Sequence, residues 1–196
     1  MNIQCANRYN KNTINRNSAN YNTIKKKVES GKINFINAMK SVDIEEVYFN
    51  NFLSSNQTTL YEWIKYYYEL SEKNKFDIDK YFRSPNEITT FNPAKNSKLR
   101  NLIFETSNEL LSDFELSTMM KYKNRENPAF QLFILPKNDV SLVLLIDFYH
   151  LVFPTENYQI GIKNDSEELY RRIKNKVKNK CNLAEVVGEV QYASQR

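Results

Sequence analysis

The segment from Asn127 to Lys180 constrains the fold most, because it is the most apolar part of the chain and ends in its most basic stretch. Continuous apolar runs, rather than strict apolar–polar alternation, are typical of strands that are covered on both faces. Such runs occupy residues 130–135, 140–148, 151–153 and 158–162. The segment therefore predicts a small sheet of about four strands, flanked by helices.

The links between these runs predict tight turns. Pro136 to Asp139 combines proline with polar turn residues, and Phe148 to His150 is short enough for a hairpin. Asp147 sits at the end of the second run, next to the second link. A buried carboxylate needs a partner, which His150 or a turn amide could supply. We favour the interpretation in which Asp147 begins the turn over the one in which it forms a site with His150.

A helix is predicted after the last run. Asp165 is its cap, and Glu168 is at the capping-box position. Leu169, Ile173 and Val177 recur every four residues and are expected to face inward. Basic side chains cover the outer face: Arg171, Arg172, Lys174, Lys176, Lys178 and Lys180.

The chain upstream of the sheet is expected to be mainly helical. Three glycines and five prolines in 196 residues leave few obligatory turns, which argues against an all-β sandwich. Apolar residues at helical spacing predict helices in 20–41, 43–54, 58–70 and 97–120. The apolar positions of the last of these are Leu99, Leu102, Ile103, Leu110, Leu111 and Phe114.

These elements predict an α+β protein, with a helical N-terminal half packed beside a small C-terminal sheet. We divide the chain into a flexible basic arm (1–19), a helical region (20–90) and an α/β region that includes the basic C-terminal helix (91–196). Residues 71–96 connect the halves, because Ser84-Pro85 and Asn92-Pro93 end helices there.

Two predicted helices around the polar turn Ser54 to Gln57 suggest a helix-turn-helix as one alternative. The second helix, however, carries Glu62 and Glu69 with only Lys65 between them, and DNA repels an acidic face. We therefore expect a plain helical hairpin.

Charge is distributed unevenly along the chain. Residues 1–32 hold seven Lys or Arg against one acid, and residues 171–180 hold six against none, whereas residues 33–170 hold 14 against 20 acids. Two basic ends around an acidic middle suit a polyanion partner or self-association. The expected partners are nucleic acid or an acidic protein surface, and a homo-oligomer is possible. The expected contacts are the six basic residues of the last helix with Lys25, Lys26 and Lys27.

The sequence lacks the residues that most catalytic mechanisms need. His150 is the single histidine, and Cys5 and Cys181 form no CxxC pair, so no metal site and no cofactor are expected. The phosphate-binding motifs GxxxxGK[ST] and GxGxxG are missing, as is the GxSxG of hydrolases. Neighbouring acids such as Glu167 and Glu168 point in different directions on a helix. We therefore predict a non-enzymatic protein.

The sequence also predicts a compartment. No apolar run reaches the roughly 18 residues that a membrane span needs. The N-terminus is polar and lacks the apolar core of a secretory signal. With two cysteines in all, a reducing compartment is the default. We expect a cytoplasmic protein that does not contact the membrane.

The order of elements in residues 97–180 resembles the half-repeat of the phospholipase D-like fold. The resemblance rests on ILP, IDFYHLVF and YQIGIKNDSEELY. The catalytic H-x-K-x4-D signature of that family is absent, because Leu151 and Val152 follow His150. The resemblance therefore implies a degenerate copy without hydrolytic activity, suited to ligand sensing, dimerisation or nucleic-acid contact.

Together these features favour a non-catalytic binding or regulatory protein that contacts nucleic acid through its basic C-terminal helix and N-terminal arm. The alternative is a structural or protein-protein interaction protein, such as an assembly subunit or an immunity or anti-defence factor. Thirteen tyrosines and 12 phenylalanines suit such interfaces. A third class, an enzyme that uses Asp147 and His150, stays open.

Overall fold

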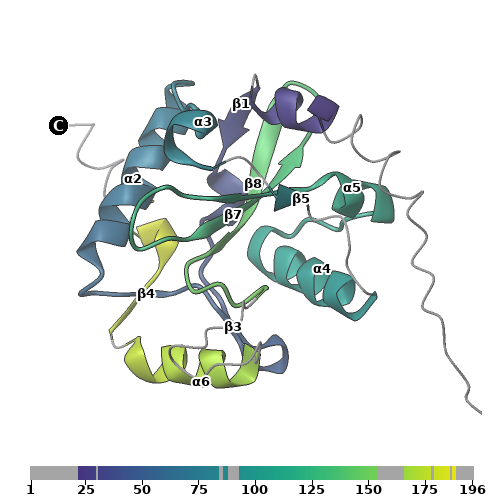
Figure 1. The fold of residues 1–196 in the computed structure, drawn as a ribbon. Coiled ribbons are helices and arrows are strands. Elements are labelled where there is room, and N and C mark those ends of the chain that lie inside the picture. Colours follow the sequence, from purple (N-terminus) through teal and green to yellow (C-terminus); the bar gives the residue numbers. More distant parts are fainter. Residues whose placement is uncertain are drawn as a thin grey trace, which may run out of the picture.

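A five-stranded sheet forms the centre of the molecule (Figure 1). The computed structural model describes residues 22–29, 31–83, 86–87, 93–153, 166–177, 179–185 and 187–188. The strand order is β1-β8-β7-β6-β5, with β1 parallel to β8 and every other neighbouring pair antiparallel. The bounds of these strands are β1 Lys32–Asn34, β5 Asn86–Glu87, β6 Met120–Lys123, β7 Gln131–Pro136 and β8 Val140–Asp147. Helices and this mixed sheet confirm the predicted α+β class.

The β7–β8 hairpin is the core of the sheet, as the two longest apolar runs predicted. Its turn is closed by Lys137 N, which donates to Val140 O at 3.2 Å. All but the last residue of β7 and most residues of β8 are buried, because helices cover both faces of the sheet. The strand expected at 151–153 does not form, so the hairpin expected through Phe148–His150 is wrong. The strand expected at 158–162 lies outside the described residues.

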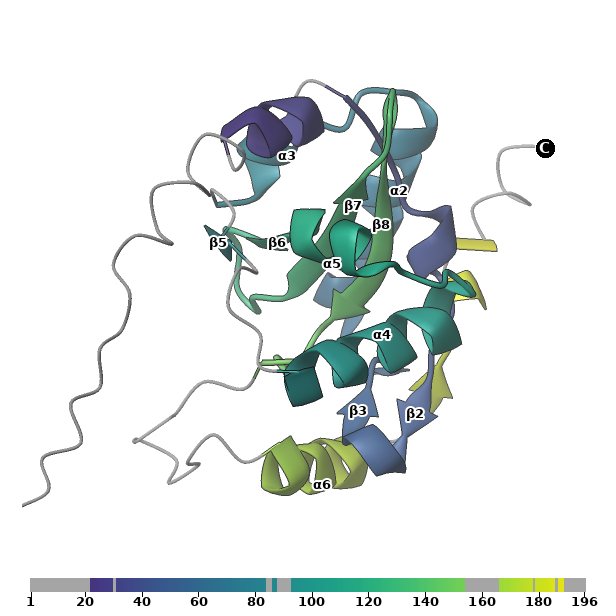
Figure 2. The same ribbon diagram turned by 90° about the vertical axis from the view of Figure 1, so that its right-hand side faces the viewer.

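Two helices cover opposite faces of the sheet (Figures 1 and 2). On one face, α2 (Thr58–Glu72) contributes Leu60, Ile64 and Tyr67 to a buried cluster with alternate β7 side chains. On the other face, α4 (Pro93–Ser107) contributes Leu99, Leu102 and Ile103 to a second cluster. The helix expected at 58–70 is thereby confirmed.

The first half of the chain contains more strand than its apolar spacing predicted. The described part of the helix expected over 20–41 covers residues 22–29, and β1 and the 3-10 helix η2 (Ile36–Ala38) occupy residues that were expected to be helical. β1 pairs with β8 and thereby buries Ile33 and Phe35. Pairing with the central strand has outweighed the local helical pattern, as tertiary contacts often do.

The helix expected over 43–54 is absent. β2 (Asp43–Ile44), η3 (Glu45–Val47), β3 (Phe49–Asn50) and β4 (Leu53–Ser54) occupy this segment. Tyr48 takes a left-handed conformation with φ 52°, which ends η3 and lets β3 return antiparallel to β2. With no first helix, the helical hairpin and the helix-turn-helix alternative are both wrong.

The helix expected over 97–120 is two helices. α4 ends at Ser107, where Asn108 has φ 57°, and α5 runs from Asp113 to Thr118. Ser112 and Glu115 form a capping box that starts α5 anew. The remaining elements are α3 (Ile78–Tyr81), α6 (Ser166–Lys176) and β9 (Lys180–Cys181). Among the described helices, none has the length and apolar character needed to cross a membrane.

Candidate interaction surfaces

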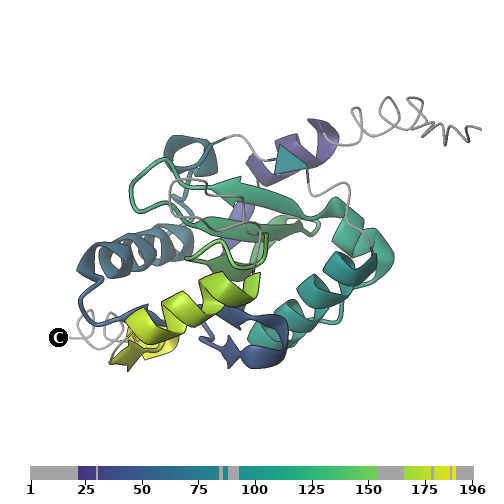
Figure 3. The same cartoon turned by 60° about the horizontal axis from the view of Figure 1, so that its bottom comes forward.

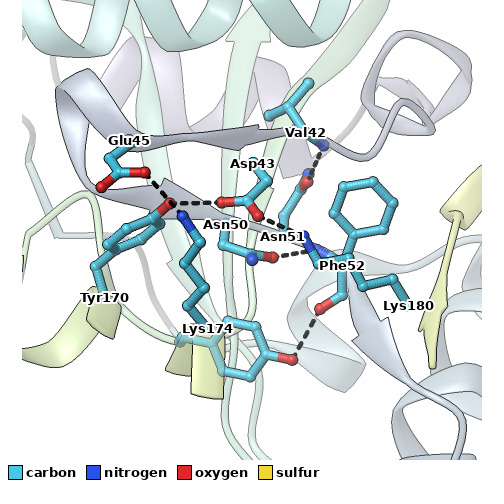
Figure 4. A network of polar contacts seen from close by, with 10 residues as sticks. Val42, Asp43, Glu45, Asn50, Asn51, Phe52, Tyr170, Lys174 and Lys180 are labelled. Carbon is cyan, nitrogen blue, oxygen red and sulfur yellow. Dashed lines mark hydrogen bonds and ion pairs between the residues drawn. The ribbon is translucent and has the colours of Figure 1, made fainter. Parts of the chain in front are cut away.

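The basic helix α6 packs against the strands of residues 43–54 (Figures 2 and 3). Its anchor is Tyr170, whose side chain is buried in the same cluster as Phe49. The Tyr170 hydroxyl donates to Asp43 Oδ1 at 2.7 Å, as Figure 4 shows. Because a buried phenol needs a hydrogen-bond partner, this bond fixes the position of α6 on β2.

Two lysines complete this attachment from either side. Lys174 Nζ donates to Glu45 Oε2 at 2.8 Å, and Lys180 Nζ pairs with Asp43 Oδ2 (Figure 4). Lys180 follows α6 in β9, which pairs antiparallel with β4. We call Asp43, Glu45, Tyr170, Lys174 and Lys180 the α6 clamp.

The charges of the α6 clamp stabilise one another. Burial alone would raise the pKa of Asp43, but hydrogen bonds from Lys180 and Tyr170 outweigh it and lower that pKa. Hydrogen bonds to Glu45 and Tyr170 raise the pKa of Lys174, and the same lysine lowers the pKa of Glu45. Each lysine also lies over a ring, with Lys174 Nζ 5.3 Å from the Tyr170 centroid and Lys180 Nζ 5.2 Å from that of Phe52.

Amide side chains hold the strands beneath the clamp. Asn51 Oδ1 accepts from Val42 N at 2.7 Å, and Asn50 Oδ1 accepts from Phe52 N at 2.9 Å (Figure 4). The Tyr149 hydroxyl donates to Phe52 O at 2.8 Å, and burial raises the pKa of that phenol to about 12. These bonds satisfy backbone groups of Val42 and Phe52, which flank the very short strands, and this explains why buried asparagines occur here.

Of the other basic residues expected as contacts on α6, the two arginines pair with glutamates of the same helix. Arg171 pairs with Glu167 at 2.6 Å, and Arg172 pairs with Glu168, each four residues earlier on the helix. Lys176 is exposed, and Lys178 lies outside the described residues. Four of the six basic residues therefore meet carboxylates of the same chain.

The structure does not bring the two predicted basic groups together. Lys25 pairs with Glu29 at 3.2 Å, and Lys26 and Lys27 are exposed on the same helix of residues 22–29. This helix and α6 lie at opposite ends of the molecule in both side views (Figures 1 and 2). The predicted nucleic-acid contacts are therefore two separate surfaces, with the sheet between them.

Asp147 and His150 belong to a structural loop. Asp147 is fully buried, and its oxygens accept from the backbone amides of Tyr149, Leu151 and Val152 at 3.2, 2.9 and 2.8 Å. The His150 ring lies 2.7 Å from Gln131 Nε2 and 3.1 Å from the carbonyl of Ala129. The carboxylate therefore accepts from loop amides, although the hairpin turn that Asp147 was expected to begin does not form.

Two half-buried lysines flank the same loop. Lys98 Nζ of α4 donates to Leu151 O at 3.0 Å, and Lys121 Nζ of β6 lies 5.5 Å from the Phe153 ring centroid. Burial lowers the pKa of both ammonium groups, and attraction to Asp147 partly offsets this change. Within the described ranges, no three His, Cys, Asp or Glu side chains are grouped to hold a metal ion.

The two most exposed large apolar side chains among the described residues, Leu110 and Phe114, lie where α4 meets α5, and Phe104 lies in the last turn of α4. Leu110 is 80% exposed, Phe114 74% and Phe104 43%. The helical pattern predicted Leu110 and Phe114 as inward positions, but the break at Asn108 turns both outward. Clustered apolar exposure is uncommon on a monomer surface and marks contact sites. We call Phe104, Leu110 and Phe114, together with the acids Glu105, Glu109, Asp113 and Glu115, the α4–α5 surface.

The α4–α5 surface is held rigidly from below. Thr106 Oγ1 donates to Leu144 O of β8 at 3.1 Å, and Leu116 is buried under α5. Lys137 Nζ contacts Glu109 Oε2 at 3.2 Å, and Arg100 pairs with Asp113. The exposed side chains are therefore presented by an ordered corner of the protein.

Sequence reasoning missed the partners of α6 and the α4–α5 surface for a physical reason. Asp43 and Tyr170 are 127 positions apart, and no local pattern encodes such a contact. The same holds for the exposure of Leu110, which depends on one left-handed residue. Comparison of the chain with protein-family models, curated proteins and solved structures gives no match in any of the three.

Proposed function

We propose that this chain is a non-catalytic interaction protein that binds another protein through the α4–α5 surface. The observation that carries this proposal is the exposure of Phe104, Leu110 and Phe114 on one ordered corner. Aromatic and large aliphatic anchors contribute most of the binding energy at protein interfaces. A rigid support favours binding, because little conformational entropy is lost on association.

The arrangement of charge also favours a protein partner. The basic residues expected to contact nucleic acid are divided between two ends of the molecule, and most of those on α6 meet carboxylates. A polyanion needs a continuous positive surface to neutralise several neighbouring phosphates. The α4–α5 surface needs only to lose water from side chains that are already exposed.

Site-specific photo-cross-linking in cells that naturally make the protein tests this proposal. p-Benzoylphenylalanine replaces Phe114 in one variant and Leu110 in another. The matched control carries it at Tyr66 of α2, which is 46% exposed. We expect a protein adduct of the same mass from positions 110 and 114 and none of that mass from position 66. No adduct, or identical adducts from all three positions, would refute the proposal.

Nucleic-acid binding by α6 alone is the second candidate. The observation in its favour is that the Arg171 and Arg172 side chains are 71% and 45% exposed in their pairs with glutamates. Exposed pairs of this kind are worth little, so phosphates could replace the glutamates.

A gel-shift titration against single- and double-stranded DNA and RNA tests the second candidate. Binding should weaken with salt at a log–log slope of about −0.9 for each phosphate contact. Changing Arg171, Arg172 and Lys176 to Gln together should remove it, with Lys26→Gln and Lys27→Gln as the control at the other end. No shift at low salt would exclude this function.

A further inference from the structure

We propose that the partner of the α4–α5 surface is a basic amphipathic segment of another protein, in which Lys or Arg side chains flank apolar ones. This inference rests on the proposed function and adds the chemistry of the partner. It follows from the charges that surround the three apolar anchors, and from the way in which those charges are held.

The anchors come from α4, from α5 and from the link between them. Arg100 is one helical turn before Phe104 on α4, and it pairs with Asp113, the residue before Phe114. This ion pair joins α4 to the first residue of α5, so Phe104 and Phe114 both lie close to the point where the two helices are linked. α5 lies near α4 in both views (Figures 1 and 2). Leu110 lies in the short link between them.

The anchors lie within an acidic stretch. Residues 104–115 contain Glu105, Glu109, Asp113 and Glu115 and no Lys or Arg. Hydrogen bonds from the Ser112 backbone and side chain lower the pKa of Glu115, which keeps this carboxylate ionised. Asp113 is 94% exposed although it pairs with Arg100. The two cations that approach, Arg100 and Lys137, leave a net negative charge around the apolar centre.

The negative charge of the α4–α5 surface favours some binding partners and disfavours others. Nucleic acid is repelled by carboxylates. A second copy that used the same face would bring like charges together, because a two-fold interface is self-complementary. A segment with apolar side chains on one face and cations beside them satisfies both parts of the surface, since electrostatic complementarity across an interface fixes partner choice.

Fluorescence anisotropy with two synthetic probe peptides tests this chemistry. Both are helical peptides of roughly 14 residues, about four turns, with the same leucine face. One has lysine at every polar position, and the other has glutamate. We expect the leucine–lysine peptide to bind the full-length protein and the leucine–glutamate peptide not to bind. Binding should weaken with added salt, because exposed charges are screened.

Matched variants locate the binding. The double variant Leu110→Ser with Phe114→Ser should bind the leucine–lysine peptide at least ~10-fold more weakly than the wild type, as expected for the loss of two anchors. Glu105→Gln with Glu109→Gln should weaken it by ~3-fold or more, through lost attraction. The controls Tyr66→Ser, and Glu62→Gln with Glu72→Gln, change the same residue types on α2 and should leave affinity unchanged. Urea unfolding of each variant confirms that it is folded.

Three results would overturn the inference. They are equal binding of both peptides, no binding of the lysine peptide, and equal losses from the α2 and α4–α5 variants. A protein dimer that Phe114→Ser dissociates in sedimentation experiments would assign the surface to a second copy instead. A photo-adduct at position 114 without peptide binding would reject the basic partner and leave the proposed function standing. No adduct at all would reject the proposed function itself.

Discussion

The α6 clamp and the α4–α5 surface show opposite uses of an amphipathic, charged helix. In the clamp, exposed lysines meet carboxylates from 43–45, and the one large ring of the helix, Tyr170, is buried. In the α4–α5 surface, two of the four carboxylates also pair with cations of the chain, but the large ring, Phe114, is mostly exposed. The first region has its partner within the chain, and the second has its apolar side chains uncovered. Charge along a sequence therefore does not reveal which charged side chains already have partners within the chain.

The two regions should differ most in how much the fold depends on them. Removal of a buried, hydrogen-bonded ring lowers the free energy of unfolding, because it leaves a cavity, reduces the buried apolar area and leaves a hydrogen-bond acceptor unpaired. A side chain that is mostly exposed contributes little, because it is in water in both the folded and the unfolded state.

Tyr170→Ala should have the largest effect on stability. The ring is 1% exposed and its hydroxyl bonds to Asp43, so its removal leaves a cavity and detaches the centre of α6. We expect a loss of about 3–5 kcal/mol in the free energy of unfolding, measured by urea titration. Tyr170→Phe keeps the ring and should cost only about 1 kcal/mol. Equal costs for the two variants would mean that the hydroxyl, and not the burial, holds α6.

Asp43→Asn should give the next largest effect, and one that depends on pH. The folded-state pKa of Asp43 lies below its ordinary value of 3.8, because hydrogen bonds from Lys180 and Tyr170 outweigh burial. A lowered pKa stabilises the fold above the ordinary pKa, and this stability is lost as the pH falls through the lowered value. At neutral pH the free energy of unfolding of the wild type should exceed that of Asp43→Asn by about 1.5 kcal/mol. This is the low end of the range for charged hydrogen bonds, because the site is partly solvated.

Unfolding midpoints of the two proteins at a series of pH values provide the measurement. The gap between them should be constant at neutral pH and should narrow below about pH 4, where Asp43 of the unfolded chain takes up a proton. It should close as the pH falls through the lower pKa of the folded state. Lys98→Gln is a useful control, because it removes a cation next to the Asp147 loop, away from the clamp. A gap that persists unchanged at low pH would show that the carboxylate contributes by shape alone.

The sequence predicted the central fold well where the signal was local. The apolar runs of β7 and β8, the turn between them and the helix that became α2 needed only residues within the segment itself. The prediction failed where distant residues decide the outcome. β1 exists because Val140–Leu142 offers it a free edge, and β4 pairs with β9 more than 120 residues later.

Side-chain contacts at the two candidate surfaces were also not predicted where they depend on distant residues or on a break in a helix. The basic face of α6 was evident in the sequence, but its acidic partners Asp43 and Glu45 were assigned to a helix that does not form. Leu110 and Phe114 fitted an inward helical stripe until Asn108 broke the helix. Periodicity predicts which side chains share one face of a helix. Which residues that face contacts depends on the path of the whole chain.

Glu167→Gln and Glu168→Gln should have small effects that salt removes. Each glutamate pairs with an arginine four residues later on the exposed side of α6 and also lies in the first turn of the helix. Such pairs contribute about 0.3–0.5 kcal/mol each, and carboxylates near a helix N-terminus add a similar amount. Urea midpoints at low and at molar salt should differ less for these variants than for the wild type. A loss above ~1.5 kcal/mol in either would mean that the pair supports more than α6 itself.

Leu110→Ser and Phe114→Ser should have the smallest effect on stability. Leu110 is 80% exposed and Phe114 74%, so neither change removes much buried area. We expect free energies of unfolding, from urea titration, within about 0.5 kcal/mol of the wild type. Leu111→Ser is the matched control, because Leu111 packs against the second cluster and its loss should be larger. If Phe114→Ser destabilised the protein as much as Leu111→Ser, Phe114 would belong to the core, and the α4–α5 surface would lose its claim as a binding site.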